Sequence, residues 1–247
     1  MAGHSKWANI KRRKGAQDAK RGKLFTKLIR EITVAAQIGG GDPDANPRLR
    51  AAIDKARSNS MPRDNIERAI AKGTGDVDMS SWEEIVFEGY GPGGVAVLVE
   101  VLTDNRNRSA GEVRHAFTKN NGNLGTTGCV AYLFNRCGIF ILDGNVDEDE
   151  LMMAALDGGA DDVRREDENF EVLCPTDAFS TCRNAIHEAG FEPASGELTW
   201  LPENWVAVPD SDAGSVMRLV EMLEDCDDVQ NVYTNADISE QALEALD

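Results

Sequence analysis

The start of this 247-residue sequence is crowded with cationic side chains. The cations are Lys6, Lys11, Arg12, Arg13, Lys14, Lys20, Arg21, Lys23 and Lys27. Lysine and arginine bind phosphate groups by releasing condensed counterions, which gives an affinity that depends on salt and hardly on base sequence. Trp7 lies among them, where its indole ring can stack on a base or anchor the segment on a hydrophobic core. The segment predicts nucleic-acid contact, with a solvated helix face as the alternative.

A second cationic cluster lies in the sequence DNRNRSAGEVRHAFTKN. Its members are Arg106, Arg108, Arg114, His115 and Lys119. Asp104 or Asn105 is suited to cap a helix here, and the apolar stripe of that helix would be Val113, Ala116 and Phe117. We take Arg106, Arg108 and Arg114 as further candidates for nucleic-acid contact, and salt bridges on a helix surface as the alternative.

Patterns that resemble a catalytic site are incomplete. The sequence GYGPGG resembles a phosphate-binding loop, but a strand follows it instead of a helix N-terminus, and no Lys-Ser/Thr closes it. We interpret it as a hairpin turn. The three histidines share no metal-binding spacing, and no nucleophile motif is present. The sequence therefore predicts no catalytic residues, no enzyme and no small-molecule substrate, with a nuclease or other hydrolase as a distant alternative.

One acidic pattern resembles the start of a calcium loop: Asp143, Asn145, Asp147 and Asp149. However, Glu148 stands where such a loop needs glycine, and Ala154 stands where it needs glutamate. The acids are better explained as favourable charges at the positive end of a helix. We therefore expect no metal and no cofactor.

The charges are divided unevenly along the chain. Residues 1–75 contain 17 Lys and Arg against 7 Asp and Glu, a net charge of +10. The remaining residues contain 9 basic against 36 acidic side chains, a net charge of −27, although the whole chain carries only −17. An asymmetry of this size predicts a head that binds polyanions on an acidic, solubilising body.

The sequence also indicates a compartment. No apolar run approaches the ~20 residues that a membrane-spanning helix needs, and no signal peptide is visible. The cysteines are odd in number and show no C-x-x-C spacing, which is typical of reduced thiols in a cytosol. We expect a cytoplasmic protein with no membrane partner.

The basic head predicts helices. Apolar residues recur at helical spacing over residues 23–38, and Gly39 ends the pattern. Asn46 and Pro47 predict the start of a second helix, and a third extends from near Pro62 to Gly73. Three apolar stripes can cover one another, so we expect a small helical bundle.

The acidic body changes to a mixture of strands and helices. The expected strands are 84–88, 95–102, 130–134, 138–142, 163–166, 170–174, 197–201, 205–208 and 229–233. The expected helices are 105–120, 147–157, 177–189 and 212–226. The strand at 84–88 and the one at 95–102 should form a hairpin. From residue 138 to residue 201 the order is that of a ferredoxin-like fold.

These elements predict an α+β protein in which an N-terminal helical bundle precedes two α+β domains. The expected domains are residues 1–75, residues 80–135 together with 205–240, and residues 136–204 as a ferredoxin-like insertion. RNA-recognition motifs share this strand order, and Phe140 lies where they place a stacking aromatic. The partner strand DENFEVLC is acidic, however, so we expect the insertion to bind protein or act as a spacer instead.

Long stretches of the sequence are similar to a known family. They are MAGHSKWANIKRRKGAQDAKRGKLFTKLIREI, ANPRLRAAIDKARSNSMPRDNIERAIAKG, FEGYGPGGVAVLVEVLTDNRNRSAGEVRHAF and NGNLGTTGCVAYLF. With almost no gaps, they closely resemble the YebC family over at least residues 1–135. The resemblance implies three domains, one α+β domain inserted in the other, and a role in gene expression. It supplies no catalytic residues.

The resemblance leaves two kinds of partner. Bacterial members are described as DNA-binding transcriptional regulators, which implies DNA. The mitochondrial relatives resemble translational activators of cytochrome c oxidase, which implies ribosomal RNA and the ribosome. The residues alone do not decide, because the third helix carries only Arg63, Arg68 and Lys72, with acids beside them, and predicts no clear recognition helix.

Overall fold

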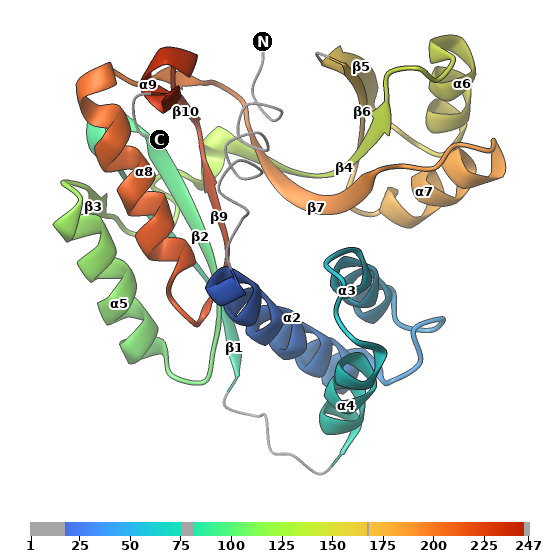
Figure 1. Cartoon of the computed structure of the whole chain (residues 1–247), viewed down its shortest axis with the longest axis horizontal. Helices are drawn as coiled ribbons and strands as arrows, with labels where there is room; N and C mark the ends of the chain where they lie inside the picture. The colour runs from blue at the N-terminus through green and yellow to red at the C-terminus, as the bar shows by residue number, and fades with distance from the viewer. Residues whose placement is uncertain (1–17, 76–81, 167, 245–247) are drawn as a thin grey trace. The chain divides into compact units, whose positions relative to one another are not determined.

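The computed structural model describes residues 18–75, 82–166 and 168–244 (Figure 1). The chain divides into two compact units. Residues 133–203 form the first, which we call the inserted unit. The described residues before and after this stretch form the second, which we call the host unit.

Three helices form the helical bundle of the host unit: α2 (Asp18–Gly39), α3 (Pro47–Ser58) and α4 (Arg63–Thr74). Asn46 caps α3, because its side chain accepts a hydrogen bond from the Leu49 N–H at 3.1 Å. The same side chain donates to the carbonyl oxygens of Ala35 at 2.8 Å and Gly40 at 2.9 Å. The buried core of the bundle includes Leu28, Ile32, Leu49, Ile53 and Ile66. The predicted helical bundle and its Asn46 cap are confirmed.

The predicted hairpin is also confirmed. β1 (Glu83–Tyr90) and β2 (Ala96–Thr103) pair antiparallel along their whole length. The short 3-10 turn η1 (Pro92–Gly94) joins them, and Gly93 and Gly94 adopt φ values of 69° and 79°. Glycine tolerates this left-handed region without a steric penalty. The glycine-rich sequence is therefore a turn between two strands.

The hairpin is the centre of a four-stranded sheet in the host unit. It is joined by β3 (Asn123–Leu124) and β9 (Val229–Thr234) in the order β3-β1-β2-β9. The helices α5 (Arg106–Lys119) and α8 (Asp210–Glu224) lie side by side along this sheet (Figure 1). Because β3 precedes the inserted unit and β9 follows it, the insertion predicted from the sequence is confirmed by the strand order.

Three short elements differ from the sequence-based expectation or were not predicted. β8 (Val206–Ala207) lies within the strand expected at 205–208, but it is shorter and is not part of the four-stranded sheet. It pairs in parallel with β10 (Ala236–Asp237) in a separate two-stranded ribbon, which α9 (Glu240–Glu244) follows. A two-residue strand has too little periodicity to reveal its partner.

The inserted unit has the ferredoxin-like order. Its elements are β4 (Phe134–Asp143), α6 (Glu148–Asp157), β5 (Asp162–Glu166), β6 (Asn169–Cys174), α7 (Phe179–Glu188) and β7 (Ser195–Pro202). The sheet order is β5-β6-β4-β7, with neighbouring strands antiparallel. Phe140 is 1% exposed and its ring stacks on Phe179 at 4.7 Å, so it belongs to the core. It therefore does not occupy the exposed position of a base-stacking aromatic.

The acids that resemble a calcium loop have structural roles at the start of α6. Asp147 is the N-cap and accepts the Glu150 N–H at 3.0 Å. Asp143 accepts the backbone N–H of Asn145 at 2.9 Å. These bonds explain the pattern by local turn and cap formation.

The strand predicted at residues 130–134 is wrong. The 3-10 turn η2 (Ala131–Leu133) occupies most of this range, and β4 begins only at Phe134. The cause is the buried carboxylate of Glu88, which accepts the backbone N–H groups of Gly128 at 2.6 Å and of Val130 and Ala131 at 2.8 Å. Because these donors bond to a side chain, they are not available to a strand ladder.

Candidate nucleic-acid interface

The predicted contact residues fall into two groups with respect to the structure. Eight of them lie outside the described side chains: Lys6, Trp7, Lys11, Arg12, Arg13, Lys14, Lys20 and Arg21. The other five are described and lie in the host unit: Lys23, Lys27, Arg106, Arg108 and Arg114. A role of either group in nucleic-acid contact stays a prediction.

Lys23 and Lys27 of α2 contact the C-terminal end of α8. The Lys27 Nζ donates to the Glu224 carbonyl oxygen at 2.6 Å. The Lys23 Nζ lies 3.0 Å from the Asp225 carboxylate and 3.4 Å from its carbonyl oxygen. The last carbonyl groups of a helix carry partial negative charge, so cations are stabilising there. These two side chains therefore help to fasten the helical bundle to α8 within the host unit.

A buried carboxylate completes this junction. Asp228, 3% exposed, accepts Arg30 Nη1 at 3.0 Å and Arg108 Nη2 at 2.7 Å. It also accepts the hydroxyl groups of Ser109 at 2.7 Å and Thr103 at 2.9 Å. Burial alone would raise the pKa of this carboxyl, but the hydrogen bonds from Ser109, Arg108 and Thr103 and the charge of Arg108 hold the pKa below its usual value. Asp228 thus joins α2, α5 and the sheet.

Arg106 and Arg108 lie at the start of α5, where Asn105 is the N-cap. Arg108 forms ion pairs with both Asp228 and Asp104. Arg106 forms a 3.4 Å ion pair with Glu83. The Arg106 side chain is nevertheless 63% exposed, and the Arg108 side chain is 43% exposed. The salt-bridge alternative weighed from the sequence is therefore present at both residues.

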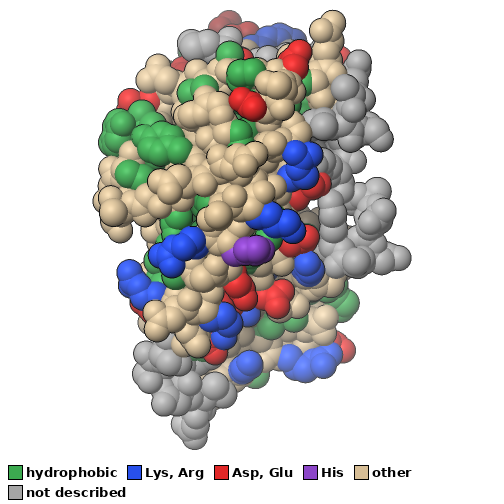
Figure 2. Space-filling view, turned by 90° about the vertical axis from the view of Figure 1, so that its left-hand side faces the viewer, with side chains coloured by type: hydrophobic (Ala, Val, Ile, Leu, Met, Phe, Trp, Pro, Cys, Tyr) green, Lys and Arg blue, Asp and Glu red, His purple; other side chains and the backbone are tan. Residues whose placement is uncertain are grey.

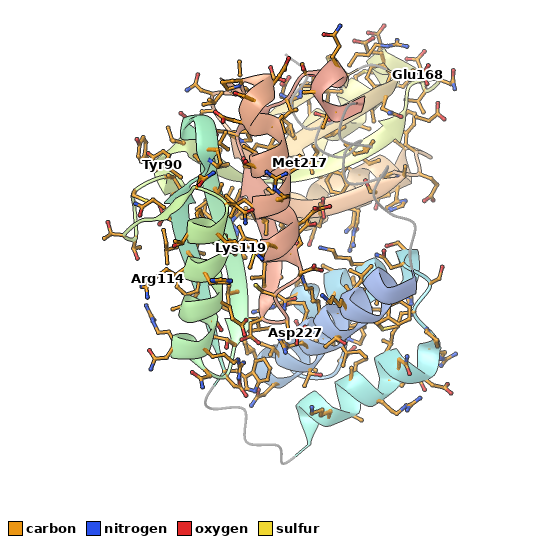
Figure 3. All side chains as sticks on the ribbon, turned by 60° about the vertical axis from the view of Figure 1, so that its left-hand side comes forward. Tyr90, Arg114, Lys119, Glu168, Met217 and Asp227 are labelled. Carbon is orange, nitrogen blue, oxygen red and sulfur yellow. The ribbon has the colours of Figure 1, made fainter. Side chains whose placement is uncertain are left out.

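The rest of the cluster is arranged differently. Arg114, His115 and Lys119 are exposed on α5, whereas Val113, Ala116 and Phe117 of the same helix are buried. Among the residues that the structure describes, none gives these three side chains a hydrogen bond or an ion pair. In Figure 3 the labelled Arg114 side chain projects outward from α5. We call Arg114, His115 and Lys119 the α5 cationic row.

The face that carries this row is mixed in charge. Figure 2 shows Lys and Arg side chains gathered over the side of the molecule formed by α5 and α8, with Asp and Glu between them. Glu112 is one exposed acid on α5 itself. Unpaired cations on such a face can bind phosphate oxygens without first breaking an internal ion pair, whereas Arg108 would have to leave Asp228.

The described part of the chain also bears on metal binding. There, no group of three or more His, Cys, Asp and Glu side chains is arranged to hold a metal ion. The residues that sequence reasoning missed are carboxylates, Glu88 and Asp228, and the cation Arg30. An isolated acid in a sequence gives no signal that it will be buried against three or four donors. No helix among the described residues is of a length and apolarity that would allow it to cross a membrane.

Two family models match the chain. The model described as "TACO1/YebC protein N-terminal domain" matches residues 5–76, and the one described as "TACO1/YebC second and third domain" matches residues 82–236. Together they cover the helical bundle, the sheet of the host unit and the inserted unit.

Curated proteins and a solved structure are similar along almost the whole length. The "Probable transcriptional regulatory protein GSU1074" of Geobacter sulfurreducens is 57% identical over 246 residues, which is 100% of each chain. A "Probable transcriptional regulatory protein" of Syntrophotalea carbinolica is 58% identical over 98% of each chain. The crystal structure of the "Conserved Hypothetical Protein Aq1575" of Aquifex aeolicus has a TM-score of 0.79 and 45% identity, covering 90% of this chain and 93% of that one. The chain therefore belongs to the TACO1/YebC family.

Proposed function

We propose that this protein is a cytoplasmic, non-enzymatic regulator of gene expression that binds nucleic acid through its phosphate groups. The printed names of its relatives, probable transcriptional regulatory proteins, support the regulatory part. The observation that carries the binding part is the α5 cationic row, whose exposed side chains have no partner among the described residues. The cations of residues 6–21 would add a second, larger contribution.

DNA is the first candidate, because the relatives are named for transcription. RNA, bound alone or in the ribosome, is the second candidate. It is favoured by the arrangement of the cations on α4, which does not suit a DNA recognition helix. Arg68 is bonded to the Asp64 carbonyl oxygen and to Asn65, both at 3.1 Å, so it is held along its own helix, and the acids Asp64 and Glu67 lie on the same helix. A recognition helix needs such side chains free to reach base edges in a major groove.

The experiment measures how affinity depends on salt. Arg114→Gln together with Lys119→Gln removes two unpaired cations, so the log–log slope should flatten by about 1.5, at roughly 0.7 to 0.9 for each phosphate contact. Arg136→Gln together with Arg165→Gln removes the same charge from exposed positions of the inserted unit and is the matched control. Duplex DNA and a structured RNA of equal length are titrated in parallel. If the α5 variant and the control have the same slope as the wild type, the α5 cationic row does not contact phosphate.

A further inference from the structure

The helical bundle contains a cleft where α3 ends and α4 begins. It has a volume of about 380 Å³. Its apolar lining consists of Pro43, Ile53, Met61, Ile66 and Ile70. Clefts of roughly 300 to 1,000 Å³ hold small organic groups, so this one has room for a single nucleobase but not for a folded segment. Ile53, Met61 and Ile66 also belong to the core of the bundle, which fixes this apolar lining in place.

The rim of the cleft is charged. Arg57 from the last turn of α3 and Arg63 from the first residue of α4 lie on it, with side chains 71% and 88% exposed. Each has one acidic partner on its own helix: Arg57 lies 3.8 Å from Asp54, and Arg63 donates to Glu67 at 2.6 Å through its Nε alone. A guanidinium group carries five N–H donors, so both retain donors for a phosphate oxygen.

The start of α4 adds a second feature that favours an anion at the same place. Pro62 is its N-cap, and no described side chain caps the helix by a hydrogen bond. The first N–H groups of a helix carry partial positive charge and point toward a ligand placed there. An uncapped helix start, two exposed guanidinium groups and an apolar lining therefore lie next to one another.

We infer that this cleft binds one unpaired nucleotide, with the base against the apolar lining and the phosphate on Arg57, Arg63 and the start of α4. Apolar and guanidinium surfaces both pack on the flat face of a base. Glu67, also on the rim, offers acceptor oxygens to the amino group of a base. This combination of charge and apolar area fits a nucleotide better than a lipid or a purely apolar peptide.

The inference rests on the proposed function and narrows its ligand. A base in an intact duplex is paired and stacked, and moving it out costs a few kcal/mol. A base in a loop or a single strand is already free to enter. The ligand class is therefore single-stranded or looped nucleic acid, bound to the phosphate-contacting surfaces and held by one inserted base.

The test compares two probes on the full chain. One is a single-stranded oligonucleotide, and the other is the same strand with abasic residues in its central part. The base-containing strand should bind about fivefold more tightly or better, which is the lower end of what contact with one base contributes. Ile70→Trp, which fills the cleft, should remove this preference and leave the affinity for the abasic strand unchanged. Ile38→Trp places the same ring at a site that is 69% exposed and not part of the cleft, and should keep the preference.

Each outcome has a distinct meaning. Equal affinity of the wild type for both strands overturns the inference and leaves the proposed function standing. Failure to bind either strand or a duplex overturns both. A preference that survives in Ile70→Trp, confirmed as folded by its thermal transition, also overturns the inference, because the base then binds elsewhere.

Discussion

The buried carboxylate of Asp228 should be among the most sensitive positions of the host unit. Asp228→Asn keeps the size of the side chain and removes its charge, while the two arginines that it contacts stay charged. Removing one partner of a buried ion pair costs about 3 to 5 kcal/mol. The side chains of Arg30 and Arg108 are 17% and 43% exposed, so water offsets part of that cost. We expect a loss of about 2 to 3 kcal/mol in the free energy of unfolding.

This loss should depend on pH in a defined direction. The pKa of Asp228 is lower in the folded protein than its usual value of 3.8, so the folded state holds the proton less tightly than the unfolded state. Its contribution to stability is therefore present above pH 4 and disappears as the pH falls through the folded pKa. The difference between wild type and Asp228→Asn should be constant near neutral pH and shrink in acid.

Urea unfolding at several pH values measures both effects. Asp225→Asn is the matched control, because Asp225 also pairs with a cation of α2 but has a side chain that is 63% exposed. An exposed pair contributes about 0 to 1 kcal/mol, so the control should change stability little at any pH. Equal losses in the two variants, or a loss at Asp228 that does not shrink in acid, would refute the reasoning from burial.

Three further predictions concern other parts of the chain. Replacing residues 11–14 by alanine removes up to four phosphate contacts, so the salt dependence of nucleic-acid affinity should flatten by roughly 3; an unchanged slope contradicts contact by this stretch. Glu88→Gln removes a charge that holds residues 128–131, so hydrogen exchange there should accelerate while exchange in α4 stays the same. Burial raises the pKa of the Cys137 and Cys226 thiols from 9.0 to about 11, which leaves roughly 100-fold less thiolate at pH 8, so alkylation should be slow until the protein is unfolded.

The fold could be predicted from the sequence largely because its elements are periodic and well punctuated. The Asn46-Pro47 start, the glycine-rich turn at residues 91–94 and the ferredoxin-like order each have a local cause that the sequence displays. The incorrect predictions concern residues whose backbone conformation depends on a side chain that is far away in the sequence. Residues 130–134 have the composition of a strand, but Glu88, which is 42 residues before Val130, accepts the backbone N–H groups of Val130 and Ala131.

The candidate site was less predictable for the same reason. Charge and spacing single out the cations of α5, yet they do not tell which of them are already paired. Arg108 is bound by Asp228, which is 120 residues away in the sequence, whereas Arg114 has no partner among the described residues. The cleft of the bundle was also invisible, because its lining consists of ordinary core residues such as Ile53 and Ile66. The apolar residues of α3 and α4 recur at the same helical spacing whether or not the two helices pack without a gap, so the spacing does not reveal a cleft between them.

The placement of the inserted unit between β3 and β9 has a consequence for the order in which the nascent chain can fold. β2 pairs with β1 on one side and with β9 on the other, so its second edge stays open until residue 234 has been made. The inserted unit, residues 133–203, is continuous and can close its own sheet first. At ~5 to 20 residues per second, adding the roughly 130 residues from the end of β2 to the end of β9 takes about 7 to 26 seconds, during which the buried strand β2 offers unpaired N–H and C=O groups. The delay is built into the connectivity, so this edge is where premature pairing with another nascent chain would begin.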